Sequence, residues 1–188
     1  MIEHSGNLRL YNQFPRNYAN IGVMTKQLAE IAAMGFNAVW VNPLYETGES
    51  KKKLCGLNNK NKHILSLSDS TQSGSLYAMK DNSLINSSFS EYLNLSADER
   101  KPLDIESLKK YTAEAANHGL TPIFDLVLKH VAIDSPLVAH PDTAHWFKRH
   151  PNGKLDIHGI NENGIVTKAH PWDDVASFNY DDPIIAKK

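Results

Sequence analysis

Residues Thr121–His130 read TPIFDLVLKH, an apolar run that carries one acidic residue inside it and ends on a histidine. Its β-branched and aromatic residues predict a buried strand that delivers polar groups at its C-terminal end. Burying a carboxylate in such a run is costly unless it is paired or hydrogen-bonded, so Asp125 needs a local partner or a functional role. Such residues are common on active-site strands, and the stretch therefore predicts a functional site where a strand ends.

The length and the charge of the chain narrow its class. It has 188 residues, enough for one domain with a real core, and 41% of them are hydrophobic. Its 20 Lys and Arg residues nearly balance its 21 Asp and Glu residues. Because no broad field of one sign would attract nucleic acid or an anionic membrane, neither is expected as a partner.

Cysteine usage and the N-terminus predict a cytoplasmic protein. The single cysteine, Cys55, cannot form an internal disulfide, which fits a reducing compartment. The N-terminal sequence MIEHSGN has no basic segment followed by an apolar one, and no apolar run approaches membrane-spanning length.

The first part of the chain predicts a strand-helix-strand unit. Alternating residues in Leu8–Phe14 favour a strand, and apolar residues at three- and four-residue steps in Ile21–Met34 favour a helix that ends at Gly35. A second strand follows at Asn37–Val41. The short connections and the intervening helix favour parallel pairing of the two strands.

Two long excursions interrupt this order. Residues 44–101 are interpreted as a loop excursion, and a helix is expected over Ile105–His118 with Asp104 as its N-cap and Gly119 as its stop. The second irregular segment follows His130. Because both excursions leave the C-terminal end of a strand, the order predicts an α/β fold with its function on one face.

Four segments occur in the order found in one enzyme family. They are Leu28–Pro43 (LAEIAAMGFNAVWVNP), Gly74–Asp81 (GSLYAMKD), Tyr111–His130, which ends in DLVLKH where the family has Asp-x-x-x-Asn-His, and Trp172–Pro183 (WDDVASFNYDDP). On these segments, which span nearly the whole chain, it resembles the N-terminal part of the alpha-amylase superfamily, glycoside hydrolase family 13. The resemblance implies the N-terminal portion of a (β/α)8 TIM barrel with long loop excursions after strands 2 and 3. Residues 1–130 would hold the first three barrel strands with two helices, and residues 131–180 a loop subdomain.

The resemblance also implies a chemistry and a ligand, an alpha-glucan or maltooligosaccharide. Family members use a retaining mechanism with two carboxylates on their fourth and fifth strands, so none of the residues here is expected to be the nucleophile or the general acid. The resemblance makes Tyr77 a stacking platform for a sugar ring, Asp125 a structural carboxylate and His130 a hydrogen-bond donor to the sugar. The rest of a barrel would be a further partner, because three strands alone expose open edges.

Lys129 departs from the family pattern, which usually has an asparagine tied to a structural calcium there. An ammonium group repels a cation, so no calcium is expected at this position, and no cofactor is expected elsewhere. The histidines at 140, 145 and 150 are five residues apart and lack a completing carboxylate or cysteine pattern, which favours surface histidines over a metal site.

Several alternatives remain open at this level. Taken alone, Tyr77 is as consistent with an ordinary half-buried aromatic residue, and Trp146 and Trp172 either line a sugar cleft or pack a loop. The segments 58–62 and 140–155 allow a maltosyltransferase-like parent. A degenerate, non-catalytic module that binds glucan or a protein is the alternative from another class, and an unrelated doubly wound domain is a third.

Overall fold

The computed structural model describes residues 7–48, 75–168 and 172–187, arranged in two compact units. The first unit comprises the described residues of Met1–Glu46 and Asn82–Leu126, and the second those of Thr47–Asp81 and Val127–Lys188. Both loop excursions predicted from the sequence contribute residues to the second unit. No helix in the described part of the chain is long and apolar enough to cross a membrane.

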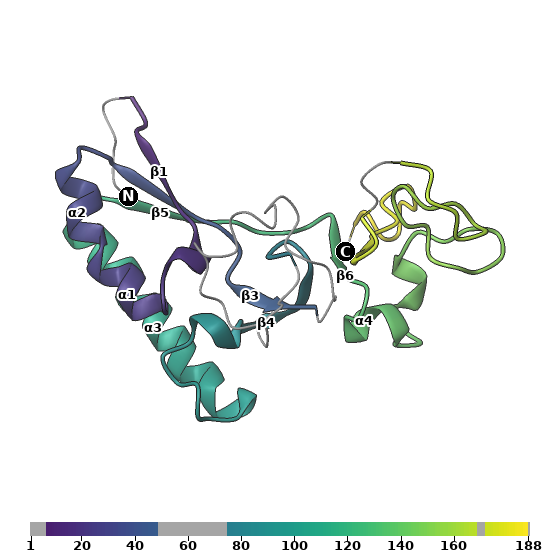
Figure 1. The fold of residues 1–188 in the computed structure, drawn as a ribbon, viewed down its shortest axis with the longest axis horizontal. Helices are drawn as coiled ribbons and strands as arrows, with labels where there is room; N and C mark the ends of the chain where they lie inside the picture. Colours follow the sequence, from purple (N-terminus) through teal and green to yellow (C-terminus); the bar gives the residue numbers. More distant parts are fainter. Residues whose placement is uncertain (1–6, 49–74, 169–171, 188) are drawn as a thin grey trace, which may run out of the picture. The chain divides into compact units, whose positions relative to one another are not determined.

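A parallel sheet forms the centre of the first unit. Its strands are β1 (Leu10–Gln13), β2 (Ala38–Val41) and β5 (Thr121–Phe124), in the order β1-β2-β5. Residue 39 of β2 is the Cα partner of residue 11 on one side and of Pro122 on the other. The predicted parallel pairing is therefore confirmed, and the helices of this unit pack together beside the strands (Figure 1).

The helix predicted over Ile21–Met34 is divided into two short helices. They are α1 (Ile21–Lys26) and α2 (Leu28–Ala33), and Gln27 joins them. The Asn20 side chain caps α1, and the four apolar residues of the predicted inner face, at positions 21, 24, 28 and 31, are buried. Met34, which was expected on the same face, is exposed because α2 ends before it.

The prediction for the next helix was wrong at its N-terminus. Helix α3 spans Ala97–Asn117, eight residues earlier than expected, and starts from a capping box in which Ser96 and Glu99 exchange hydrogen bonds. It continues through Pro102, which removes one helical donor without ending the helix. Asp104 is thus not an N-cap but a buried residue in the helix, and Gly119 follows the helix end with a φ of 68°.

Asp104 belongs to a buried network of charges and hydrogen bonds. The Ser90 hydroxyl donates to its carboxylate at 2.6 Å, and the Arg100 guanidinium lies 3.7 Å from it. Arg100 also donates to the Ile85 carbonyl at 3.0 Å and lies 3.7 Å from the Glu46 carboxylate. Burial raises the pKa of Asp104, whereas the Ser90 bond and the Arg100 charge lower it. The network fastens the segment before α3 onto that helix.

A second buried polar contact joins the sheet to the helices. The Tyr111 hydroxyl of α3 donates to Gln13 Oε1 of β1 at 2.6 Å, and Gln13 Nε2 donates to the Met24 carbonyl of α1 at 3.0 Å. Gln13 and Tyr111 are fully buried. Tyr111 was expected to face inward, which the structure confirms, and burial raises the pKa of its phenol.

The prediction that Thr121–His130 forms a buried strand was wrong in extent and in burial. Strand β5 stops at Phe124, and among the described strands it pairs only with β2, at the edge of the sheet. The side chains of Ile123 and Phe124 are 40% and 39% exposed, and those of Leu126 and Leu128 are exposed as well. A strand paired on one side covers less of its own surface, which explains the difference.

Residues 44–101 hold regular structure as well as loop. They include the paired strands β3 (Tyr45–Thr47) and β4 (Met79–Ile85), a 3-10 turn at Ser87–Phe89 and the start of α3. The lysine run and the Asn/Lys-rich stretch in residues 51–62, together with Cys55, lie outside the described residues.

Short elements make up the rest of the second unit. Strands β6 (His130–Ala132) and β7 (Val175–Ser177) pair antiparallel, and α4 (Pro136–Ala139) and a 3-10 turn at Ala144–Trp146 lie between them in sequence. The sequence predicted only an irregular segment after His130, because three-residue strands are too short for a periodic pattern. Small buried side chains at 78, 132 and 175 form a core cluster here.

Replacing Tyr111 by Phe is expected to lower the free energy of unfolding by roughly 1–3 kcal/mol, because Gln13 then keeps a buried, unpaired oxygen. Urea unfolding followed by far-UV circular dichroism measures the change. Tyr92→Phe, which removes a hydroxyl from a half-buried tyrosine of the same unit, is the control. Equal stability of Tyr111→Phe and the native chain would contradict the role given to this bond.

Arg100→Met is expected to cost about 3 kcal/mol at pH 7, because it leaves the Asp104 carboxylate buried without its cation. The cost should shrink as the pH falls and Asp104 takes up a proton. Denaturant unfolding at several pH values tests both statements. Lys110→Met removes a charge from an exposed position of the same helix and serves as the control. A cost that does not depend on pH would exclude Asp104 as the cause.

Candidate functional site

Two of the residues predicted for the site, Tyr77 and His130, meet in the second unit. Tyr77 lies just before β4, His130 begins β6, and His130 Nε2 is 2.9 Å from the Tyr77 backbone oxygen. Since a carbonyl oxygen only accepts, Nε2 carries the hydrogen of this bond. The other ring nitrogen, Nδ1, is buried and has no hydrogen-bond partner among the described residues.

The surroundings of His130 favour its neutral form. Burial is the main cause that lowers its pKa below the ordinary value of 6.5, and the positive charge of Lys129 lowers it further. The bond to Tyr77 and the negative charge of Asp174 act in the opposite direction but do not reverse the shift. A neutral imidazole with its only N–H bonded to a carbonyl donates to a sugar only if it exchanges that carbonyl for a sugar oxygen.

Three other side chains of this unit lie against the ring of Trp172. The Lys129 ammonium lies 5.2 Å from the ring centroid, which is the geometry of a cation–π contact. The rings of His130 and His158 have centroids 6.1 and 5.0 Å from it. The Trp172 backbone N–H donates to the His158 carbonyl at 2.9 Å, and the Trp172 side chain is still 42% exposed. Of the two uses predicted for Trp172, the packing of a loop is therefore observed.

Asp125, the third residue predicted for the site, belongs to the first unit. It follows β5 directly, is half-buried, and its N–H donates to the Val41 carbonyl at 3.0 Å. Burial raises the pKa of the Tyr45 phenol, and the negative charge of Asp125 adds to that rise. The Asp125 carboxylate thus lies close to Tyr45.

The described residues offer little for a metal ion. They contain no group of three or more His, Cys, Asp or Glu side chains that could hold one. His140 and His150 each lie near one carboxylate, of Asp142 at 3.9 Å and of Asp156 at 3.7 Å. The ammonium of Lys129 has no lone pair to offer a calcium ion, so this residue does not fit the family's metal site. The absence of calcium there stays a prediction.

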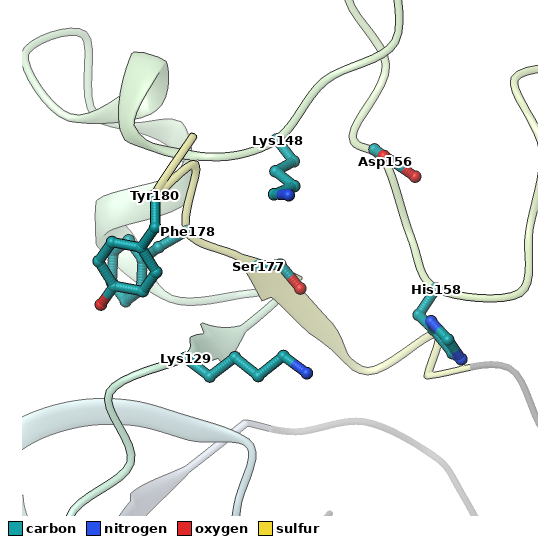
Figure 2. Close-up of a pocket in the computed structure, with 7 residues that line it drawn as sticks. All are labelled: Lys129, Lys148, Asp156, His158, Ser177, Phe178 and Tyr180. Carbon is teal, nitrogen blue, oxygen red and sulfur yellow. The ribbon is translucent and has the colours of Figure 1, made fainter. Parts of the chain in front are cut away.

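A pocket of about 310 Å³ opens in the second unit, and two of the residues that line it, Lys129 and His158, also contact the Trp172 ring. Figure 2 shows that its walls come from the end of the run before β6, from residues 148–158 and from the segment around β7. It is lined by Lys129, Lys148, Asp156, His158, Ser177, Phe178 and Tyr180. Of these residues, only Lys129 was discussed individually from the sequence, and Ser177, Phe178 and Tyr180 were considered only as part of the segment Trp172–Pro183. The pocket itself was not predicted, because residues from three distant segments show no common spacing.

The comparisons with known proteins establish the fold. The chain is similar in structure to an alpha-amylase from Lactobacillus plantarum, with a TM-score of 0.65, 23% identity, and coverage of 96% of this chain and 33% of that one. An acarbose complex of an alpha-amylase from Geobacillus thermoleovorans matches with a TM-score of 0.56, 16% identity, and coverage of 96% and 35%. The isomaltulose synthase from Protaminobacter rubrum matches with a TM-score of 0.58, 13% identity, and coverage of 96% and 31%.

No protein-family model matches the sequence, and no curated protein does either. The structural matches define the class: the chain has the mixed α/β fold of the N-terminal part of alpha-amylase superfamily enzymes. The resemblance predicted from the four segments is therefore confirmed at the level of the fold. The chain spans about a third of the length of these structures.

His130 is expected to titrate below pH 6.5 in NMR spectra of the imidazole protons. Lys129→Met should raise that midpoint, and Lys187→Met, which removes a charge that is not among those acting on His130, should leave it unchanged. Between the lowered pKa and 6.5 the unfolded chain binds more protons at this residue than the folded chain. The contribution of His130 to stability is therefore complete above pH 6.5 and is lost as the pH falls through this window. A midpoint at or above 6.5 would contradict the assigned environment.

Proposed function

We propose that this chain is part of an alpha-glucan-active glycoside hydrolase or transglycosidase with a retaining mechanism. The observation that carries the proposal is the bond between His130 and the Tyr77 backbone, because it joins two of the family-like segments across 53 positions of sequence. The fold supports it, since the structural matches include two alpha-amylases and an isomaltulose synthase. The ligand proposed is an alpha-glucan or maltooligosaccharide, and the proposed location is the cytoplasm.

We assign roles within each unit. In the second unit, Tyr77 has an exposed aromatic ring suited to the apolar face of a pyranose, and His130 offers an N–H to a sugar oxygen once its bond to the carbonyl is exchanged. In the first unit, Asp125 is a structural carboxylate beside Tyr45. None of the described residues is proposed as nucleophile or general acid, because the family places these on its fourth and fifth strands.

The open edge of the sheet is an argument for a further partner, which we propose to be the remainder of a barrel. Ile123 and Phe124 are partly exposed on β5, whose outer side pairs with none of the described strands. Parallel strands are normally buried on both faces in α/β proteins. Further strands that continue the sheet would cover these side chains. Because the family carries its nucleophile and general acid on such strands, this chain alone is expected to bind sugar without cleaving it.

Binding of acarbose and maltotriose to the purified chain, measured by ligand-detected NMR, tests the proposal. Tyr77→Ala is expected to weaken binding about tenfold, since an aromatic stacking contact contributes roughly 0.5–1.5 kcal/mol and buried area adds to it. Tyr92→Ala, at a half-buried position of the first unit, is the control. Binding that is equal in both variants would exclude Tyr77 as the platform, and release of reducing sugar by the purified chain would contradict the expected lack of cleavage.

A second candidate is a non-catalytic glucan-binding module, favoured by Lys129 in place of the family's asparagine. The native transcript and the intact mass of the natural protein distinguish the two. A reading frame that continues into a strand with Gly-x-Arg-x-Asp and then a strand ending in Glu supports the enzyme. A stop codon directly after Lys188, with an agreeing mass, supports the module.

A further inference from the structure

The pocket lined by Lys129 and Lys148 combines two cationic groups with an apolar wall. In Figure 2 the side chains of Lys129 and Lys148 extend toward the same space from opposite sides, and Ser177 lies between them. On another side the rings of Phe178 and Tyr180 contact each other with centroids 5.8 Å apart. Lysine ammonium groups, hydroxyls and imidazoles are the donors that commonly bind phosphate oxygens.

Lys129 is the cation most available to a ligand. Its ammonium lies over the Trp172 ring, and none of the carboxylates in the described part of the chain is within ion-pair distance of it. A cation–π contact leaves the hydrogens that point away from the ring able to donate. The side chain is also exposed, so a ligand can reach it without displacing packed residues.

The other charges around the pocket do not prevent anion binding. Lys148 is 2.7 Å from the Asp181 carboxylate, but Asp181 is largely exposed, and such surface pairs contribute little and exchange readily. Asp156 lines the pocket and lies 3.7 Å from His150 Nε2, and in Figure 2 its carboxylate points away from the space between the two lysines. Another lysine, Lys168, has its ammonium 3.3 Å from Nε2 of His158, which lines the pocket.

We propose that this pocket binds a phosphorylated sugar, with Lys129 and Lys148 on the phosphate and the rings of Phe178 and Tyr180 against the sugar. A phosphate dianion matches two ammonium groups better than a neutral sugar does, because a neutral ligand leaves the Lys129 charge without an anionic partner in the described part of the chain. A volume of about 310 Å³ lies at the small end of ligand pockets, which suits a monosaccharide phosphate. The sugar half of this inference rests on the proposed function, and the phosphate half rests on the pocket alone.

Isothermal titration of the chain with glucose 6-phosphate, glucose and inorganic phosphate tests the inference. Glucose 6-phosphate is expected to bind at least tenfold more tightly than either of the other two. Lys129→Met and Lys148→Met should each weaken it about tenfold, Lys129→Arg should keep most of the affinity, and Lys187→Met is the matched control. Because Lys129 is exposed and Lys148 is partly exposed, higher salt should weaken binding as well.

The outcomes separate this inference from the proposed function. Equal affinity for glucose and glucose 6-phosphate, or no effect of the Met variants at 129 and 148, would overturn the phosphate site even if acarbose binds. Inorganic phosphate bound as tightly as the sugar phosphate would overturn the sugar contacts. Binding of glucose 6-phosphate with the expected variant pattern, in a chain that does not bind acarbose or maltotriose, would support the pocket and contradict the glucan proposal.

Discussion

A hydrogen bond between two fully buried side chains, Tyr111 and Gln13, is the constraint on which the first unit depends. Apolar contacts between helices and a sheet are not directional, so by themselves they allow one layer to shift over the other. A buried amide, in contrast, must find partners at fixed distances. Gln13 finds them in α3 and at the Met24 carbonyl of α1, and β1 is thereby fixed to both helices.

The sequence could predict the elements of the first unit because these elements are long enough to show a hydrophobic period. The alternation in β1 and the apolar steps through α1 and α2 follow from hydrophobic patterning. The parallel order follows from the helix and the short connections between the two strands. The start of α3 was missed because residues 44–101 were interpreted as a loop excursion and Asp104 was predicted to be the N-cap. The better signal was Ser96 with Glu99 three residues later, a capping box that fixes the N-terminus and tolerates a proline further along.

The second unit could not be predicted in the same way. Its strands have three residues each, and its key contacts join positions far apart in sequence, such as Lys129 with Trp172 and His130 with the Tyr77 backbone. Every residue has a backbone carbonyl, so a hydrogen bond to that carbonyl cannot be predicted from the type of residue that provides it. The family-like segments pointed to Tyr77 and His130, but neither the pocket nor the contact of His158 with the Trp172 ring followed from them.

Lys129 connects the two binding proposals physically. Its charge is one of the causes that lower the pKa of the neighbouring His130, and its ammonium also faces the pocket. An anion bound to Lys129 would offset part of that positive charge, so His130 would take up a proton more readily. A protonated imidazole has N–H groups on both nitrogens and can keep its bond to Tyr77 while it donates a second one. An anionic ligand bound to Lys129 as proposed would thus change the hydrogen-bonding capacity of the histidine beside it.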